Sequence, residues 1–217
     1  MAHTPTAGQA HHHAHHFATA DDEFEACKQG MWVFLVTEVL MFGGLFVSYF
    51  IFRGLYPTTW HEAHQALSVQ MGTINTVVLI TSSLTMVLAV GAAQRGQRDR
   101  STLFLVLTFL LACCFLVVKY FEYTSKFHHG LLPGAHFASH DLHAPKANLF
   151  FSHYFVMTGL HGLHVVIGMG LMIWLLKRTR AGEFSSAYYT PVEIVGFYWH
   201  FVDLVWIYLF PILYLMG

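Results

Sequence analysis

Three histidines lie within one apolar stretch of the sequence, at His153, His161 and His164. Imidazole side chains bind metals, ligate haem, carry protons or join packed helices through hydrogen bonds. On an α-helix, which turns by about 100° per residue, positions 153 and 164 lie about 20° apart and position 161 lies within about 80° of either. The spacing therefore predicts three imidazoles on one face of a helix.

This face lacks the spacing of a metal site. Zinc takes about four ligands, and helical histidine pairs that share an ion are often spaced i, i+4. The first and last imidazoles are separated by about 16 Å along a helix axis, and His161 and His164 need further ligands from elsewhere. Haem ligation that recruits His200 stays open as an alternative. We expect a hydrogen-bonded helix interface, with Thr158 and Gly162 as small residues that allow close approach.

Other apolar stretches also carry ionisable residues, which at membrane depth normally face protein or water. Glu38 indicates either a carboxyl group that exchanges protons or a structural acceptor for a neighbouring hydroxyl or amide. Lys119 and Glu122 are three residues apart, which suits an ion pair on one helix face. His200 and Asp203, in another apolar stretch, are also three residues apart.

The elements that must position these residues are membrane-spanning helices. Of the 217 residues, 55% are hydrophobic and 11% are charged, whereas soluble domains carry about 25% charged residues. Because roughly 20 apolar residues cross a hydrocarbon core about 30 Å thick, we predict an all-α, polytopic bundle of five transmembrane helices. The bundle occupies residues 28–217. It follows a His-rich tail, residues 1–27, that we expect to be disordered. The predicted spans are about 31–53, 71–93, 102–123, 148–176 and 194–215.

The basic residues outside these spans or at their ends predict their orientation, because cytoplasmic loops are enriched in Lys and Arg. One side of the membrane would carry seven such residues: Lys28, Arg95, Arg98, Arg100, Lys177, Arg178 and Arg180. The other side would carry three: Arg53, Lys126 and Lys146. We therefore expect a cytoplasmic N-terminus and a C-terminus outside. The net charge of −1 offers no basic face for nucleic acid.

Two C-terminal stretches, "FFSHYFVMTGLHGLHVVIG" and "FYWHFVDLVWIYLFPILYLMG", resemble subunit III of haem-copper cytochrome c oxidases. The family pattern F-x-x-T-G-x-H-G-x-H-V-x-x-G is met from Phe155 to Gly168, and Y-W-H-F-V-D-x-V-W from Tyr198 to Trp206. The segment "TEVLMFGGLF" places Glu38 at the family's carbodiimide-reactive membrane carboxylate. The resemblance runs from about Lys28 to Gly217 and matches the shorter, five-helix bacterial form, which lacks the first two of seven spans.

The resemblance implies a non-catalytic accessory subunit of an aerobic terminal oxidase in the bacterial inner membrane. No residue of this chain would then be catalytic or bind a metal. A structural polar network would be made of His153, His161, His164, Glu122, His200, Asp203 and Glu193. Oxygen reduction coupled to proton pumping then takes place in subunit I, fed with electrons by subunit II, and these partner subunits hold the haem and copper. Subunit III would pack directly against subunit I, alongside the other subunits of the respiratory complex, support proton uptake and bind structural phospholipids. Lys28 and Arg178 are the candidates for lipid headgroups, because they stand where cations can meet phosphates at the membrane boundary.

Other functions remain open. Quinol oxidases and nitric-oxide-reductase-type complexes have similar third subunits, and the choice of electron donor belongs to subunit II. A transmembrane b-type cytochrome would use His161, His164 and His200, and would show a Soret band. A proton-coupled carrier centred on Glu38 would transport its substrate when reconstituted alone.

Overall fold

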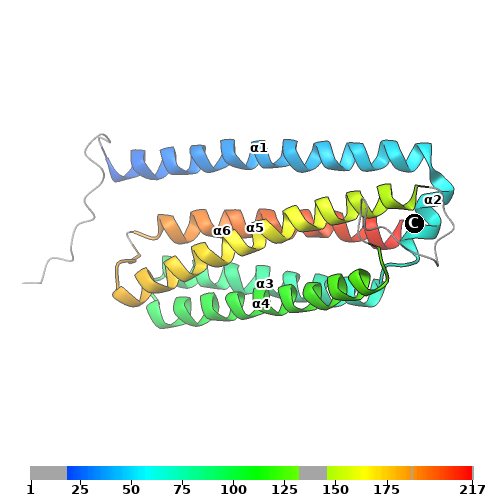
Figure 1. Cartoon of the computed structure of the whole chain (residues 1–217). Coiled ribbons are helices and arrows are strands. Elements are labelled where there is room, and N and C mark those ends of the chain that lie inside the picture. The colour runs from blue at the N-terminus through cyan, green and yellow to red at the C-terminus, as the bar shows by residue number, and fades with distance from the viewer. Residues whose placement is uncertain (1–18, 132–145, 187, 217) are drawn as a thin grey trace, which may run out of the picture.

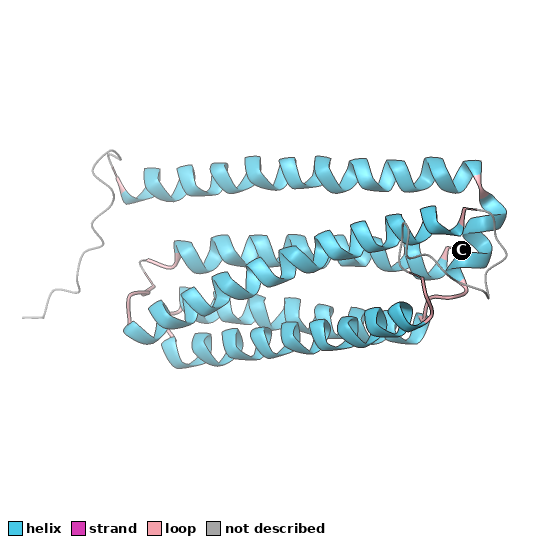
Figure 2. Ribbon diagram, viewed as in Figure 1, coloured by secondary structure: helices cyan, strands magenta, loops and turns pink. Residues whose placement is uncertain are grey.

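Long helices make up most of the described chain, which comprises residues 19–131, 146–186 and 188–216 of a computed structural model. Within these ranges only an isolated bridge joins residues in β geometry, and Figure 2 shows no strand. The helices are α1 (Ala20–Leu55), α2 (Pro57–His64), α3 (Val69–Gln94), α4 (Arg98–His128), α5 (Ala147–Ala181) and α6 (Thr190–Phe210), followed by a π-helical segment, η1 (Pro211–Leu215).

Five helical segments are long and apolar enough to cross a membrane, which confirms the predicted all-α, five-span fold. They are Asp22–Leu55, Val69–Gln94, Arg98–His128, Ala147–Ala181 and Thr190–Leu215.

The helices extend beyond the predicted spans at several ends, because polar residues continue them past the apolar core. Thr19 caps α1: its hydroxyl accepts a hydrogen bond from the Asp22 amide, and the Asp22 carboxylate accepts one from the Thr19 amide. Residues 20–27 of the predicted tail are therefore helical, whereas 1–18 lie outside the described residues. Similarly, α4 continues to His128 and includes Lys126, which the sequence had placed in a loop.

The helices form a bundle in which α1 lies on one side and the antiparallel pair α3 and α4 lies on the other (Figure 1). Helices α5 and α6 run between them (Figure 1). Helix α1 packs on α6, α5 and the short α2, while α3 packs most extensively on α4. Helices α5 and α6 therefore carry the residues that join the two sides.

Helices α5 and α6 approach each other closely at Gly168. A Cβ atom added there would lie 2.8 Å from two ring carbons of Trp199, so only glycine fits without displacing the indole. The sequence had predicted close approach at Gly162, and that prediction is wrong within this chain. A Cβ at Gly162 meets no described atom within 4 Å; the residue lines an open groove of about 420 Å³ between α4 and α5.

The end of the bundle where α1 finishes is closed by α2 and η1. The Trp60 side chain of α2 is fully buried. Because the last carbonyl groups of a helix have no donor within the helix, side chains supply donors to two carbonyl groups of η1. The Tyr49 hydroxyl donates to the Ile212 carbonyl at 3.1 Å, and His64 Nε2 donates to the Tyr214 carbonyl at 3.1 Å. These bonds fix η1 and direct the Tyr214 ring into the bundle.

Candidate functional site

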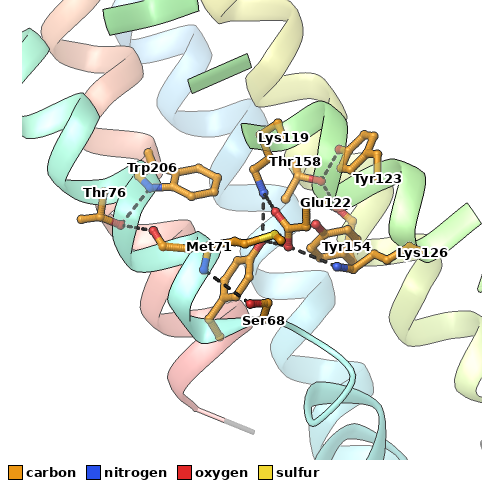
Figure 3. Close-up of polar contacts among 12 residues, drawn as sticks. Ser68, Met71, Thr76, Lys119, Glu122, Tyr123, Lys126, Tyr154, Thr158 and Trp206 are labelled. Carbon is orange, nitrogen blue, oxygen red and sulfur yellow. Dashed lines mark hydrogen bonds and ion pairs between the residues drawn. The ribbon is translucent and has the colours of Figure 1, made fainter. Parts of the chain in front are cut away.

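A buried ionic cluster on α4 is centred on Glu122, whose residue surface is 1% exposed. Its carboxylate accepts hydrogen bonds from Lys119 Nζ at 2.9 Å, from Lys126 Nζ at 3.1 Å and from the Tyr214 hydroxyl at 2.6 Å. Lys119 also donates to the Tyr214 hydroxyl at 2.8 Å. Figure 3 shows both ammonium groups directed at this carboxylate. The cluster fixes η1 to α4 and satisfies three charges inside the bundle.

Aromatic rings and hydroxyl groups surround this cluster and connect it to α5. Lys119 Nζ lies 4.5 Å from the centroid of the Trp206 ring, over which the cation is favourably placed. The Tyr123 hydroxyl and Thr158 Oγ1 are 2.6 Å apart (Figure 3). The Tyr154 and Tyr214 hydroxyls are 3.3 Å apart. The hydroxyl groups of Tyr123, Tyr154 and Tyr214, all near the buried charges, therefore each have a defined partner.

Two of the α5 histidines face α1. His153 Nε2 accepts a hydrogen bond from the Ser48 hydroxyl at 3.1 Å. His164 Nε2 lies 3.1 Å from Glu38 Oε2. The Nδ1 atom of each ring bonds its own helix, at the carbonyl four residues earlier: 2.9 Å for His153 and 2.8 Å for His164. The imidazoles therefore join α1 to α5, at two levels of the bundle.

His161 points away from α1 and packs between aromatic rings. Its ring centroid lies 5.5 Å from that of Phe115 on α4 and 5.3 Å from that of Trp206 on α6. Neither ring nitrogen has a hydrogen-bond partner among the described residues. The His161 side chain is offset around the helix by about 80° from His153 and about 60° from His164, and it therefore packs against different helices.

We expect that replacing His161 by phenylalanine keeps the fold and changes the free energy of unfolding by about 1 kcal/mol or less. The buried imidazole has no hydrogen-bond partner among the described residues, so replacing it by an apolar ring breaks no such bond. The measurement is the thermal unfolding midpoint of the purified protein. His161→Ala is the contrasting variant, since it opens a cavity and should destabilise by about 3 kcal/mol or more. Equal losses in the two variants would show that the imidazole itself is required.

Three side chains of α6 bond hydroxyl groups of α3. The Trp199 indole N–H donates to Ser82 Oγ at 2.9 Å, and the Trp206 indole N–H donates to Thr76 Oγ1 at 3.0 Å (Figure 3). His200 Nδ1 lies 2.8 Å from Ser83 Oγ. Hydroxyls at intervals along α3 therefore fix the register of these two helices.

The remaining predicted network residues have separate neighbours. Asp203 is buried beside Ser83. Glu193 pairs with Lys28 at 3.6 Å, near the start of α1 and α6. His161 and His200 contact different helices, α4 and α6 for the first and α3 for the second. The structure thus brings the predicted polar residues together in several small groups and not in one site.

An open cleft of about 710 Å³ lies between the first turns of α1, the end of α5 and the start of α6. Apolar and aromatic side chains line most of it, among them Phe24, Phe34, Trp174 and Tyr198. Tyr188, from the loop before α6, also lines it. Burial raises the pKa of the Tyr188 hydroxyl, which therefore stays protonated at neutral pH and can donate a hydrogen bond.

The two predicted lipid-binding cations stand beside this cleft. Lys28 Nζ lies 4.5 Å from the Phe24 ring centroid, and the Arg178 guanidinium carbon lies 4.9 Å from that of Trp174. Arg178 also pairs with Glu183. Both aromatic residues line the cleft, so each cation contacts one residue of its wall.

Fold and polar contacts together define a class of protein: a multi-pass helical membrane protein held together by internal hydrogen bonds. In the parts of the chain described above, no three His, Cys, Asp or Glu side chains converge as a metal site would require.

Comparison with known proteins narrows the class to one family. The family model described as "Cytochrome c oxidase subunit III" matches residues 7–217. The chain is 35% identical over 187 residues to cytochrome c oxidase subunit 3 of Corynebacterium diphtheriae, covering 85% of each protein. It is 34% identical over 215 residues to the subunit of the same name from Synechocystis sp., covering 98% of this chain and 82% of the relative.

The protein belongs to the cytochrome c oxidase subunit III family, as its sequence motifs predicted, and so to an oxidoreductase complex.

Proposed function

We propose that this chain is the non-catalytic accessory subunit of a haem-copper oxidase in a bacterial inner membrane, with its N-terminus in the cytoplasm. It packs directly on subunit I, stabilises it and supports its proton uptake, while subunits I and II hold the haem and copper. The observation that carries this proposal is the set of contacts that the histidines of α5 and α6 make with neighbouring helices. Three of them hydrogen-bond side chains of neighbouring helices, and the fourth packs between aromatic rings.

The test is purification of the oxidase through an affinity tag on this chain. We expect the haem-copper subunit to co-purify, together with the haem absorption and oxidase activity of the preparation. If detergent then separates this chain from its partners, the Soret band should stay with the partner fraction. A Soret band that follows this chain would support the b-type cytochrome and contradict the accessory role.

We also propose that the cleft beside α1 holds a structural phospholipid. Its wall is mostly apolar and aromatic, which suits acyl chains, and Lys28 and Arg178 stand beside it with their side chains 35% and 32% exposed. Cations at the membrane boundary attract lipid phosphates by about 1 kcal/mol each.

Arg178→Gln is expected to weaken retention of anionic phospholipid about fivefold, because one contact of about 1 kcal/mol is lost. The measurement is bound phospholipid per purified complex after graded detergent washing. Arg180→Gln is the matched control, since Arg180 is exposed two residues further along the same helix. Equal lipid loss in both variants would remove Arg178 from the lipid site.

A further inference from the structure

His200 differs from the three histidines of α5 because one of its ring nitrogens is open at the surface of the bundle. Its Nδ1 atom lies 2.8 Å from Ser83 Oγ on α3. Its Nε2 atom has no hydrogen-bond partner among the described residues and is not buried. In contrast, the imidazoles of His153 and His164 use both nitrogens within the chain, and the His161 side chain is buried.

This open nitrogen lies at the depth of the hydrocarbon core. His200 is near the middle of the span Thr190–Leu215, and Ser83 is near the middle of the span Val69–Gln94. A polar side chain at this depth normally faces protein or water, because lipid tails offer no hydrogen bond. Exposure of the imidazole nitrogen to lipid is therefore costly, whereas a polar group on a neighbouring helix would satisfy it.

Apolar side chains continue this surface along both helices. On α6, residues four and seven positions after His200 lie on the same side of the helix, and on α3, Ser83 is flanked by apolar residues three positions before it and four after it. These four apolar side chains are between 45% and 52% exposed. The surface, called the His200 face below, consists of Ile80, Ser83 and Val87 of α3 and of His200, Leu204 and Ile207 of α6.

Two helices border the His200 face. On one side, α1 packs against aromatic residues of α6: the ring centroids of Phe42 and Phe201 are 6.3 Å apart, and those of Phe46 and Tyr208 are 6.5 Å apart. On the other side, α3 packs on α6 and carries Ser83. Figure 1 shows α6 between α1 and the α3–α4 pair. A helix laid along the His200 face would therefore rest on α6 with α1 and α3 beside it.

We propose that the His200 face docks a transmembrane helix of the partner subunit, and that this helix places a hydroxyl or amide side chain against His200 Nε2. Hydroxyl and amide groups both donate and accept hydrogen bonds, so they match the ring whether the Ser83 hydroxyl donates to Nδ1 or accepts from it. The occupant is a helix and not an acyl chain, because an acyl chain leaves Nε2 without a partner. The proposal rests on the accessory role proposed above and gives it a contact surface.

The test is photocrosslinking in the purified oxidase complex, with p-benzoylphenylalanine in place of Leu204. Mass spectrometry should place the crosslink in an apolar span of the partner subunit, within about two turns of a Ser, Thr, Asn or Gln residue. Adducts with lipid alone, or a crosslinked span without such a residue, would overturn the proposal. The complex is isolated through this chain before irradiation, so either result leaves the accessory role standing and contradicts only the docking surface.

A second position for the same probe provides the matched control. Leu110 lies on α4 and is 53% exposed, close to the 49% of Leu204, but it is outside the His200 face. We expect p-benzoylphenylalanine at Leu110 to form lipid adducts. Equal yields of crosslinked protein from the two positions would overturn the assignment of the contact to the His200 face.

Two variants separate the contact with the partner subunit from the contact within the chain. His200→Phe keeps a ring but removes both nitrogens, whereas Ser83→Ala removes only the partner of Nδ1. Both lose the bond between Ser83 and His200, so a role confined to this chain predicts equal effects. We expect graded detergent to release the His200→Phe chain from the complex about fivefold more readily than the Ser83→Ala chain, as the loss of one further hydrogen bond implies.

Equal release of the two variants would overturn the proposal. The crosslink from position 204 is made with His200 and Ser83 both in place, and it therefore decides the matter if either of these variants fails to fold.

Discussion

Replacing Glu122 by glutamine is expected to destabilise the bundle by about 3–5 kcal/mol, the range measured when one partner of a buried ion pair is removed. Glutamine keeps the shape of the side chain but leaves Lys119 and Lys126 without their carboxylate. Both lysines are at least 93% buried, with exposed fractions of 7% and 4%. The measurement is the thermal unfolding midpoint of the purified protein, together with its recovery from the membrane.

Two further variants isolate the charge effect. Glu62→Gln removes an exposed carboxylate on α2 and should change stability by less than about 0.5 kcal/mol. Lys126→Met leaves Glu122 paired with Lys119 at 2.9 Å, and should therefore destabilise less than Glu122→Gln does. A Glu122→Gln protein as stable as Glu62→Gln would contradict a structural role for the cluster.

A methyl group at Gly168 should weaken the contact between α5 and α6 by about 1–3 kcal/mol, as overpacking does in other tightly packed interiors. The new Cβ would lie 2.8 Å from the Trp199 ring and 3.2 Å from the Tyr198 ring. Neither ring is free to move: Trp199 donates to Ser82, and Tyr198 donates to the His164 carbonyl. Gly168→Ala should lower the unfolding midpoint, and Gly168→Leu should abolish recovery of the folded protein.

Gly159→Ala is the matched control for this prediction. Gly159 lies on the same helix, and an added Cβ there meets no described atom within 4 Å. The alanine variant should fold and assemble like the wild type, with a small gain in helix propensity. Equal stability of the Gly159 and Gly168 alanine variants would show that α5 and α6 are not tightly packed at Gly168.

The number and type of the transmembrane helices were predictable, because each span is an apolar tract long enough to cross a bilayer. Helix ends were less predictable. Thr19 and Asp22 form a capping box, a signal present in the sequence but masked by the polar, His-rich region around it. At the other end of a span, Lys126 stands four residues after Glu122 and pairs with it. That spacing was visible, but the lysine was assigned to a loop by its charge.

Contacts between distant residues could not be predicted from spacing alone. Tyr214 donates to Glu122 across 92 residues of sequence, and His164 meets Glu38 across 126. Helical periodicity predicted that His153 and His164 share a face, but not that α1 covers it. Likewise, the oxidase motif contains both Gly162 and Gly168, and only the packing of α6 shows which of the two lies against a ring.

We propose that the polar side chains inside these helices hold the protein together and leave electron transfer to partner subunits. The most direct test of this proposal is the iron, copper and haem content of this chain after it has been purified away from its partners in folded form. We expect no stoichiometric metal and no Soret band. One equivalent of iron or copper held by the chain, and lost on substitution of His161 or His200, would contradict it.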